Sequence, residues 1–119
     1  MTTFKVEPVP GCEDEIVEEF SRLSLPCANG FASMLDILEE NDPSLNDRCG
    51  QLADQFELYA VPLPDCPRRV LILSIDQKAS GFPRWIHGTL PVSEKACERG
   101  SRIAIRQFGL VDPTWEKRQ

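Results

Sequence analysis

The stretch RVLILSI at residues 69–75 decides the fold class of this chain. Its positions are apolar almost throughout instead of alternating with polar ones, which indicates a central strand covered on both faces. Phe56–Leu63 precedes it and Arg84–Leu90 follows it, and both segments have strand character. Turn residues separate the three segments at Pro64–Pro67 and at Asp76–Pro83. We therefore expect an antiparallel meander with residues 69–75 in the middle.

Two helices are expected before this meander, after a short strand at Phe4–Val9. The first helix begins with the acidic run Glu13–Glu15 and should end at Leu25-Pro26. The second should begin near Asn29 and end before Pro43. Together with the strands, these helices predict a core that includes Phe31, Leu35, Leu38, Leu58, Leu71, Leu73 and Ile86.

The third helix should follow Pro91, and its course is open at one point. Gly100 interrupts the helical pattern, and residues 102–108 fit either a continued helix or a strand. Residues 43–55 are polar and are expected to be irregular. The resulting order is β-α-α-β-β-β-α, an α+β fold in which a helix hairpin packs on a small antiparallel sheet. Residues 1–119 are expected to form a single domain with a polar tail from about residue 112, and the first strand should lie at an edge or beside the last.

The cysteine pattern predicts reduced thiols and a cytoplasmic location. There are five cysteines, an odd number, and they are widely spaced with no CxxC pair and only one histidine to join them. A zinc site is not expected, and no glycine-rich phosphate loop suggests a cofactor. The longest apolar run is too short to cross a bilayer, and the N-terminus does not resemble a signal peptide.

Charge is distributed unevenly along the chain. The net charge is −6 and the pI is about 4.8, which is unlike most proteins that bind nucleic acids. Most acidic residues fall in residues 1–65, whereas most basic residues fall in residues 66–119. A locally basic face in the second half therefore stays compatible with the sequence.

The order of elements and two local motifs resemble the RelE/ParE superfamily of bacterial toxin–antitoxin systems, including its HigB-like branch. The motifs are Phe56-Glu57-Leu58, and Arg69–Ile72 followed by Trp85–Gly88. The resemblance implies an mRNA endoribonuclease that acts on the ribosome, or an attenuated relative of one, or, for the ParE branch, a gyrase poison. It also implies a cognate antitoxin and RNA as partners. By position, Arg69 would hold the scissile phosphate and His87 would lie within reach of it.

Each candidate residue also has a structural interpretation. His87 suits general acid–base chemistry, but it also suits a structural hydrogen bond at the end of a strand. Arg68 and Arg69 fit a phosphate clamp or a solvated strand end. The other candidate RNA-binding residues fit one basic face or a solvated helix surface: Arg84, Arg99, Arg102 and Arg106.

The sequence departs from the family pattern in three respects. Thr89-Leu90-Pro91 stands where the family has a basic run, Tyr59 stands where an arginine often follows Glu-Leu, and the overall charge is acidic. The alternative is a non-catalytic acidic module that binds a protein, as an inhibitor or an accessory protein. The acidic helix hairpin, the missing basic run and the proline-rich turn at Pro62–Pro67 fit this alternative.

Overall fold

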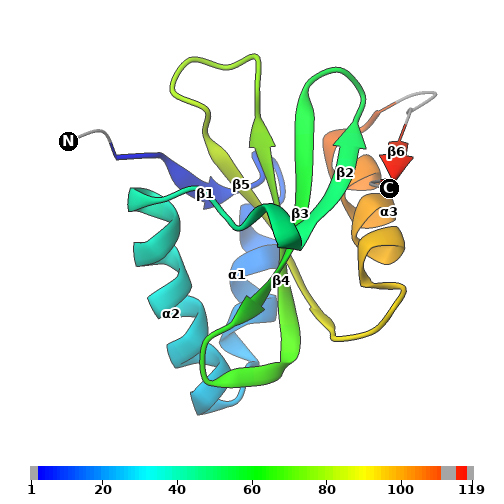
Figure 1. Cartoon of the computed structure of the whole chain (residues 1–119). Helices are drawn as coiled ribbons and strands as arrows, with labels where there is room; N and C mark the ends of the chain where they lie inside the picture. The colour runs from blue at the N-terminus through cyan, green and yellow to red at the C-terminus, as the bar shows by residue number, and fades with distance from the viewer. Residues whose placement is uncertain (1–2, 111–114, 118–119) are drawn as a thin grey trace.

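A computed structural model describes residues 3–110 and 115–117, which form a mixed sheet covered by helices (Figure 1). The described strands lie in the order β1-β5-β4-β3-β2-β6, and among them only β1 and β5 run parallel. The strands and helices have these bounds: β1 (Val6–Pro8), α1 (Glu13–Ser21), α2 (Leu25–Glu40), the short 3-10 helix η1 (Leu45–Asp47), β2 (Arg48–Leu52), β3 (Phe56–Leu63), β4 (Cys66–Asp76), β5 (Arg84–Pro91), α3 (Ala96–Phe108) and β6 (Trp115–Lys117).

Strand β4 lies inside the sheet and is covered on both faces, as its apolar run predicts. Leu71 and Leu73 belong to the core beneath α1 and α2, whereas Val70 and Ile72 belong to the core beneath α3. Figure 1 shows α1 and α2 on one side of the sheet and α3 on the other. Of the residues predicted to be core, Leu38, Leu58, Leu71, Leu73 and Ile86 are buried, while Phe31 and Leu35 are partly buried and pack against them. The α+β class is therefore confirmed.

The sheet extends beyond the predicted meander at both edges. The first strand is at an edge beside the last strand of the meander, as expected, because β1 pairs with β5. The expectation that residues 43–55 are irregular was wrong, since they contain η1 and β2. Cys49 and Leu52 of β2 are buried against the α3 layer. This burial stabilises a strand that the polar sequence of the segment does not indicate.

Helix boundaries depart from expectation at three places. Helix α1 ends at Ser21 instead of Leu25-Pro26. Helix α2 begins at Leu25 instead of Asn29, because Pro26 occupies its first turn, where a missing N–H costs nothing. Helix α3 begins at Ala96 and continues through Gly100 to Phe108, so residues 102–108 are helical. A Cβ atom at Gly100 would lie 3.0 Å from Cδ1 of Ile72, so the glycine allows α3 to approach β4 closely.

Two disulfides overturn the expectation of reduced cysteines. Cys27 of α2 is bonded to Cys66 of β4, and Cys49 of β2 is bonded to Cys97 of α3. The paired Cα atoms are 4.9 and 5.2 Å apart, within the ordinary range for a disulfide. Cys12 is free and half-buried. Each disulfide therefore links a helical layer to the sheet, one on each face.

Candidate functional site

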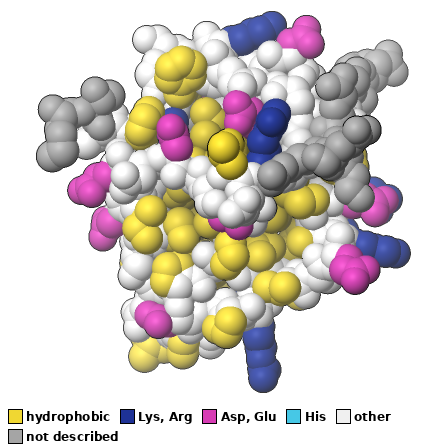
Figure 2. Space-filling view, in the orientation of Figure 1, with side chains coloured by type: hydrophobic (Ala, Val, Ile, Leu, Met, Phe, Trp, Pro, Cys, Tyr) yellow, Lys and Arg dark blue, Asp and Glu magenta, His cyan; other side chains and the backbone are white. Residues whose placement is uncertain are grey.

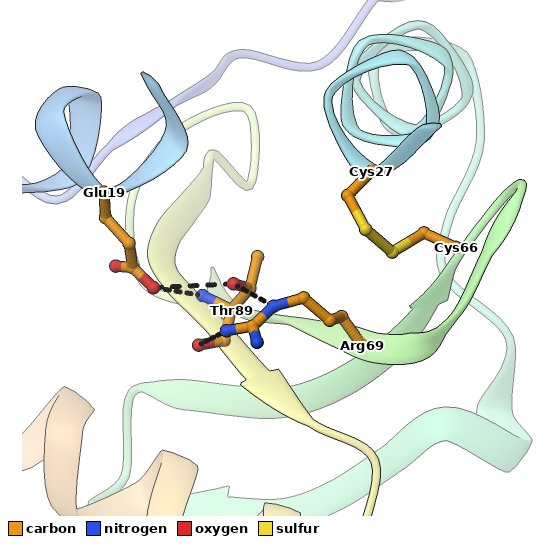
Figure 3. The surroundings of a disulfide bond; sticks show 5 residues. All are labelled: Glu19, Cys27, Cys66, Arg69 and Thr89. Carbon is orange, nitrogen blue, oxygen red and sulfur yellow. Dashed lines mark hydrogen bonds between the residues drawn. A yellow bond between two sulfur atoms is a disulfide. The ribbon is translucent and has the colours of Figure 1, made fainter. Parts of the chain in front are cut away.

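Arg69 is held against β5 beside the Cys27–Cys66 disulfide (Figure 3). Its Nε donates a hydrogen bond to Oγ1 of Thr89 at 2.9 Å, and its Nη2 donates to the carbonyl oxygen of Thr89 at 3.2 Å. The amide of Thr89 in turn donates to Oε1 of Glu19 on α1, at 3.1 Å. Thr89 therefore fixes the orientation of the guanidinium and separates it from the Glu19 carboxylate.

The surroundings of Arg69 are poorly suited to a phosphate. The adjoining cavity has a volume of about 390 Å³ and is lined by Glu15, Glu18, Glu19, Arg22, Leu23 and Arg69. Three carboxylates in this lining face two guanidinium groups, and Nη2 of Arg22 is already bonded to Glu18 at 2.6 Å. A phosphodiester in the cavity would meet repulsion from like charges. In the described part of the chain, however, no carboxylate lies within ion-pair distance of Arg69 itself.

His87 is buried and both of its ring nitrogens are engaged. Its Nε2 lies 2.8 Å from Oγ of Ser74, and its Nδ1 lies 2.7 Å from Oε1 of Gln107. Because Nε2 of Gln107 donates to the His87 carbonyl at 2.9 Å, Oε1 is the free acceptor and Nδ1 carries the proton. Burial lowers the pKa of His87 to about 4, against a smaller opposing effect of the Gln107 hydrogen bond. The ring is therefore neutral near pH 7, and its contacts support the structural interpretation.

Arg69 and His87 lie on opposite faces of the sheet, although their strands are neighbours as expected. Arg69 contacts Thr89 on the α1 side, whereas His87 contacts Gln107 on α3. The register changes from Leu73↔Ile86 to Ile72↔Gly88, so β5 has one extra residue, His87, at a bulge. If side chains alternated strictly along β5, His87 and Thr89 would lie on the same face of the sheet. The bulge places Thr89 on the opposite face instead. The two residues thus do not form the single site that the family resemblance implies.

The basic residues are also dispersed. Arg99, Arg102 and Arg106 are exposed on α3, and Arg102 is bonded to Glu98 at 2.7 Å. Arg68 is exposed near the start of β4. Arg84 is fully buried and lies opposite Ile75, at the far end of the β4–β5 pair from Arg69. The five arginines proposed to contact RNA therefore do not share one surface.

A larger cavity surrounds Arg84 on the face of the sheet that α1 and α2 cover, and we call it the Arg84 pocket. Its volume is about 790 Å³, within the range of small-molecule sites. Segments distant in sequence contribute to it: the chain before β1, the segment after α2, η1, β3, β4, the β4–β5 loop and the start of β5. Its lining is mainly apolar, with Phe4, Pro43, Leu45, Tyr59, Ile75 and Phe82, and it also includes Asp42, Glu57, Gln77 and Arg84. Figure 2 shows hydrophobic side chains gathered over a large part of one face of the molecule.

Arg84 is incompletely paired within this pocket. Its Nη2 donates to Oδ1 of Asp42, its Nη1 donates to the Phe82 carbonyl, and its guanidinium lies 3.5 Å from the centre of the Phe4 ring. Its buried Nε has no hydrogen-bond partner among residues 3–110 and 115–117. Burial lowers the pKa of Arg84, while the charge of Asp42 and its hydrogen bond act in the opposite direction.

Tyr59 and Glu57 form the other polar wall of the pocket. The Tyr59 hydroxyl donates to Oε2 of Glu57 at 2.6 Å, and Nε2 of Gln77 donates to Oε1 of the same carboxylate. Nε of Arg48 lies 3.7 Å from Glu57. Burial raises the pKa of Tyr59, and the hydrogen bond and charge of Glu57 raise it further, so the hydroxyl remains a donor. Sequence reasoning noted Tyr59 only as a departure from the family pattern, and it missed Phe4, Asp42 and Phe82 altogether.

Comparison with known proteins identifies no relative. No family model, no curated protein and no solved structure matches the chain. None of the described helices is both long enough and apolar enough to cross a membrane. Within the described ranges, no group of three or more His, Cys, Asp or Glu side chains is placed to hold a metal ion.

Proposed function

We propose that this chain is a non-catalytic module that binds a partner protein through the Arg84 pocket. The observation that carries the proposal is the rim of the pocket. Leu45 is 70% exposed and Phe82 is 52% exposed there, beside a cavity of about 790 Å³. Large apolar side chains gathered at a concave surface are typical of a site that a partner covers.

The contacts of the two predicted catalytic residues support a non-catalytic role. A general acid or base needs an accessible group whose pKa is near the working pH. His87 is 1% exposed, has a pKa lowered to about 4, and is bonded through both ring nitrogens. The only other predicted catalytic residue, Arg69, faces carboxylates on the opposite side of the sheet.

The second candidate is a RelE/ParE-like toxin in the bacterial cytoplasm, with an antitoxin and ribosomal RNA or mRNA as partners. One observation favours it: among the described residues, no carboxylate forms an ion pair with Arg69, whose guanidinium is hydrogen-bonded to Thr89. The cytoplasmic location that the cysteine pattern predicts is part of this second proposal. Two disulfides instead favour an oxidising compartment, because cytosolic thiols are generally kept reduced.

Photocrosslinking tests the binding proposal. Benzoylphenylalanine replaces Phe82 at the pocket rim or, as a matched control, Arg102 on the exposed surface of α3. In cells of the source organism, irradiation should give one discrete adduct from position 82 and none from position 102. The partner, identified by mass spectrometry, should then bind the purified chain and lose affinity for a Phe82→Asp variant. Equal crosslinking at both positions, or unchanged affinity of the variant, contradicts the proposal.

Induced expression in a bacterial host tests the toxin candidate. The readouts are growth and primer extension on a reporter mRNA. We expect normal growth and an uncut message. A cleaved message whose cleavage disappears in an Arg69→Ala variant would establish the ribonuclease instead, and growth arrest with an uncut message would indicate the gyrase-directed branch.

A further inference from the structure

On one edge of the Arg84 guanidinium, only one of the two nitrogen donors has a hydrogen-bond partner in the described part of the chain. Nε and Nη2 point to the same side of the group and together form a fork that matches the two oxygens of a carboxylate. Asp42 occupies only the Nη2 position, and Nε has no partner among the described residues. A buried donor without a partner is costly, so this edge has an unmet demand for an acceptor.

Asp42 is placed so that another carboxylate can replace it. Its side chain is 74% exposed, whereas that of Arg84 is 1% exposed. It lies beyond the end of α2, in a segment outside the helices and strands, between Asn41 and Pro43. Moving the Asp42 side chain into water therefore breaks no helix and frees Nη2 of Arg84, a residue that lines the pocket.

We propose that the Arg84 pocket binds a carboxylate attached to an aromatic or aliphatic group, and that this carboxylate displaces Asp42 and pairs with Nε and Nη2 of Arg84. The apolar group of the ligand would pack against Leu45 and Phe82 at the rim. The inference rests on the proposed function, since it names the chemistry that the same pocket recognises.

The charges of the pocket select a monoanion. Once Asp42 has turned away, Arg84 contributes one buried positive charge, which one carboxylate neutralises. A doubly charged phosphate would add a second negative charge near Glu57, which also lines the pocket. A cationic ligand would face Arg84 directly. The apolar lining of the pocket would contact the aromatic or aliphatic group of the ligand.

Titration calorimetry on the full chain tests the inference with two acids. The first, 3-phenylpropionate, represents a free small acid, and the second, N-acetylphenylalanine, represents the C-terminus of a protein. The amide of each compound is the neutral control. We expect at least one acid to bind the wild-type chain and neither amide to do so. If only 3-phenylpropionate binds, the ligand is a small acid; binding of N-acetylphenylalanine indicates a chain terminus.

Variants link the binding to the geometry. Asp42→Asn removes the competing carboxylate and should tighten acid binding about tenfold or more. Phe82→Ser should weaken it about tenfold, whereas Leu25→Ser, at a residue 72% exposed outside the pocket lining, should leave it unchanged. Because Arg84→Gln risks unfolding the chain, Asp42→Asn is the decisive variant. The inference fails if neither acid binds the wild type or Asp42→Asn, or if amides bind as well as acids.

The two proposals fail separately. Acid binding without a crosslinked protein at position 82 keeps the carboxylate site and overturns the protein-binding function. A crosslinked partner whose binding is unaffected by Asp42→Asn, together with no acid binding, keeps the function and overturns the carboxylate inference.

Discussion

Removing the Cys27–Cys66 disulfide should lower the stability of the chain substantially. The two residues are 39 positions apart, and closing a loop of that length reduces the entropy of the unfolded chain by an amount worth about 4 kcal/mol at 25 °C. Measured losses for such disulfides are typically about 2–4 kcal/mol. The perturbation is the double variant Cys27→Ala/Cys66→Ala, which also detaches α2 from the start of β4.

Urea unfolding followed by circular dichroism provides the measurement. The double variant should lose about 2–4 kcal/mol relative to wild type, and a reducing agent should destabilise wild type more than the variant. Cys12→Ala is the control, because Cys12 is half-buried and free, and it should cost about 1 kcal/mol or less.

Thiol titration of the denatured, unreduced protein is the independent check. The structure predicts one reactive thiol, that of Cys12, and peptide mapping should recover Cys27–Cys66 and Cys49–Cys97. Five reactive thiols, together with an unfolding midpoint that the reducing agent does not change, would refute both disulfides and the oxidising compartment inferred from them.

Three further substitutions test the core and the bulge. Leu71→Ala should cost about 2–5 kcal/mol in urea melts, because Leu71 is 0% exposed in the central strand; a loss below about 1 kcal/mol would mean that this face is not core. Gly100→Ala sets a gain in helix propensity of about 1 kcal/mol against the overpacking of a Cβ that would lie 3.0 Å from Cδ1 of buried Ile72. We expect a net loss of about 1 kcal/mol in urea melts, and a net gain would contradict the close packing of α3. The free energy of unfolding of the wild type should fall by about 3 kcal/mol as the pH drops from about 6.5 to 4. Burial lowers the pKa of His87 to about 4, so in this pH range the imidazole binds a proton in the unfolded chain but not in the folded one. His87→Gln should remove that part of the pH dependence, and an unchanged profile would mean that His87 is accessible.

Local patterns fixed much of the fold in advance. The apolar run at residues 69–75 has too few polar positions for a half-exposed strand, so it could only be central, and β4 lies inside the sheet. The apolar residues at helical spacing likewise predicted α1 and α2, because a helix with one apolar face must bury it. The predictions were wrong at helix boundaries. A Leu25-Pro26 pair can either end one helix or begin the next, and only the packed structure shows that it begins α2.

The candidate site was beyond the reach of local patterns. The Arg84 pocket brings together Phe4, Asp42, Tyr59 and Phe82 from four segments, and no short motif contains them. A disulfide likewise depends on the distance between Cα atoms and not on the number or spacing of cysteines in the sequence.

The sequence by itself determined which segments are apolar, and hence which became the core strands and helices. The tertiary structure decided which side chains meet. One bulge shows why: the extra residue His87 in β5 reverses the faces of the residues that follow it, so His87 packs on α3 while Arg69 and Thr89 face α1. Since side chains alternate along a strand, a shift of one residue exchanges the two faces of the sheet, and the pairing with β4 that produces this shift is a long-range property.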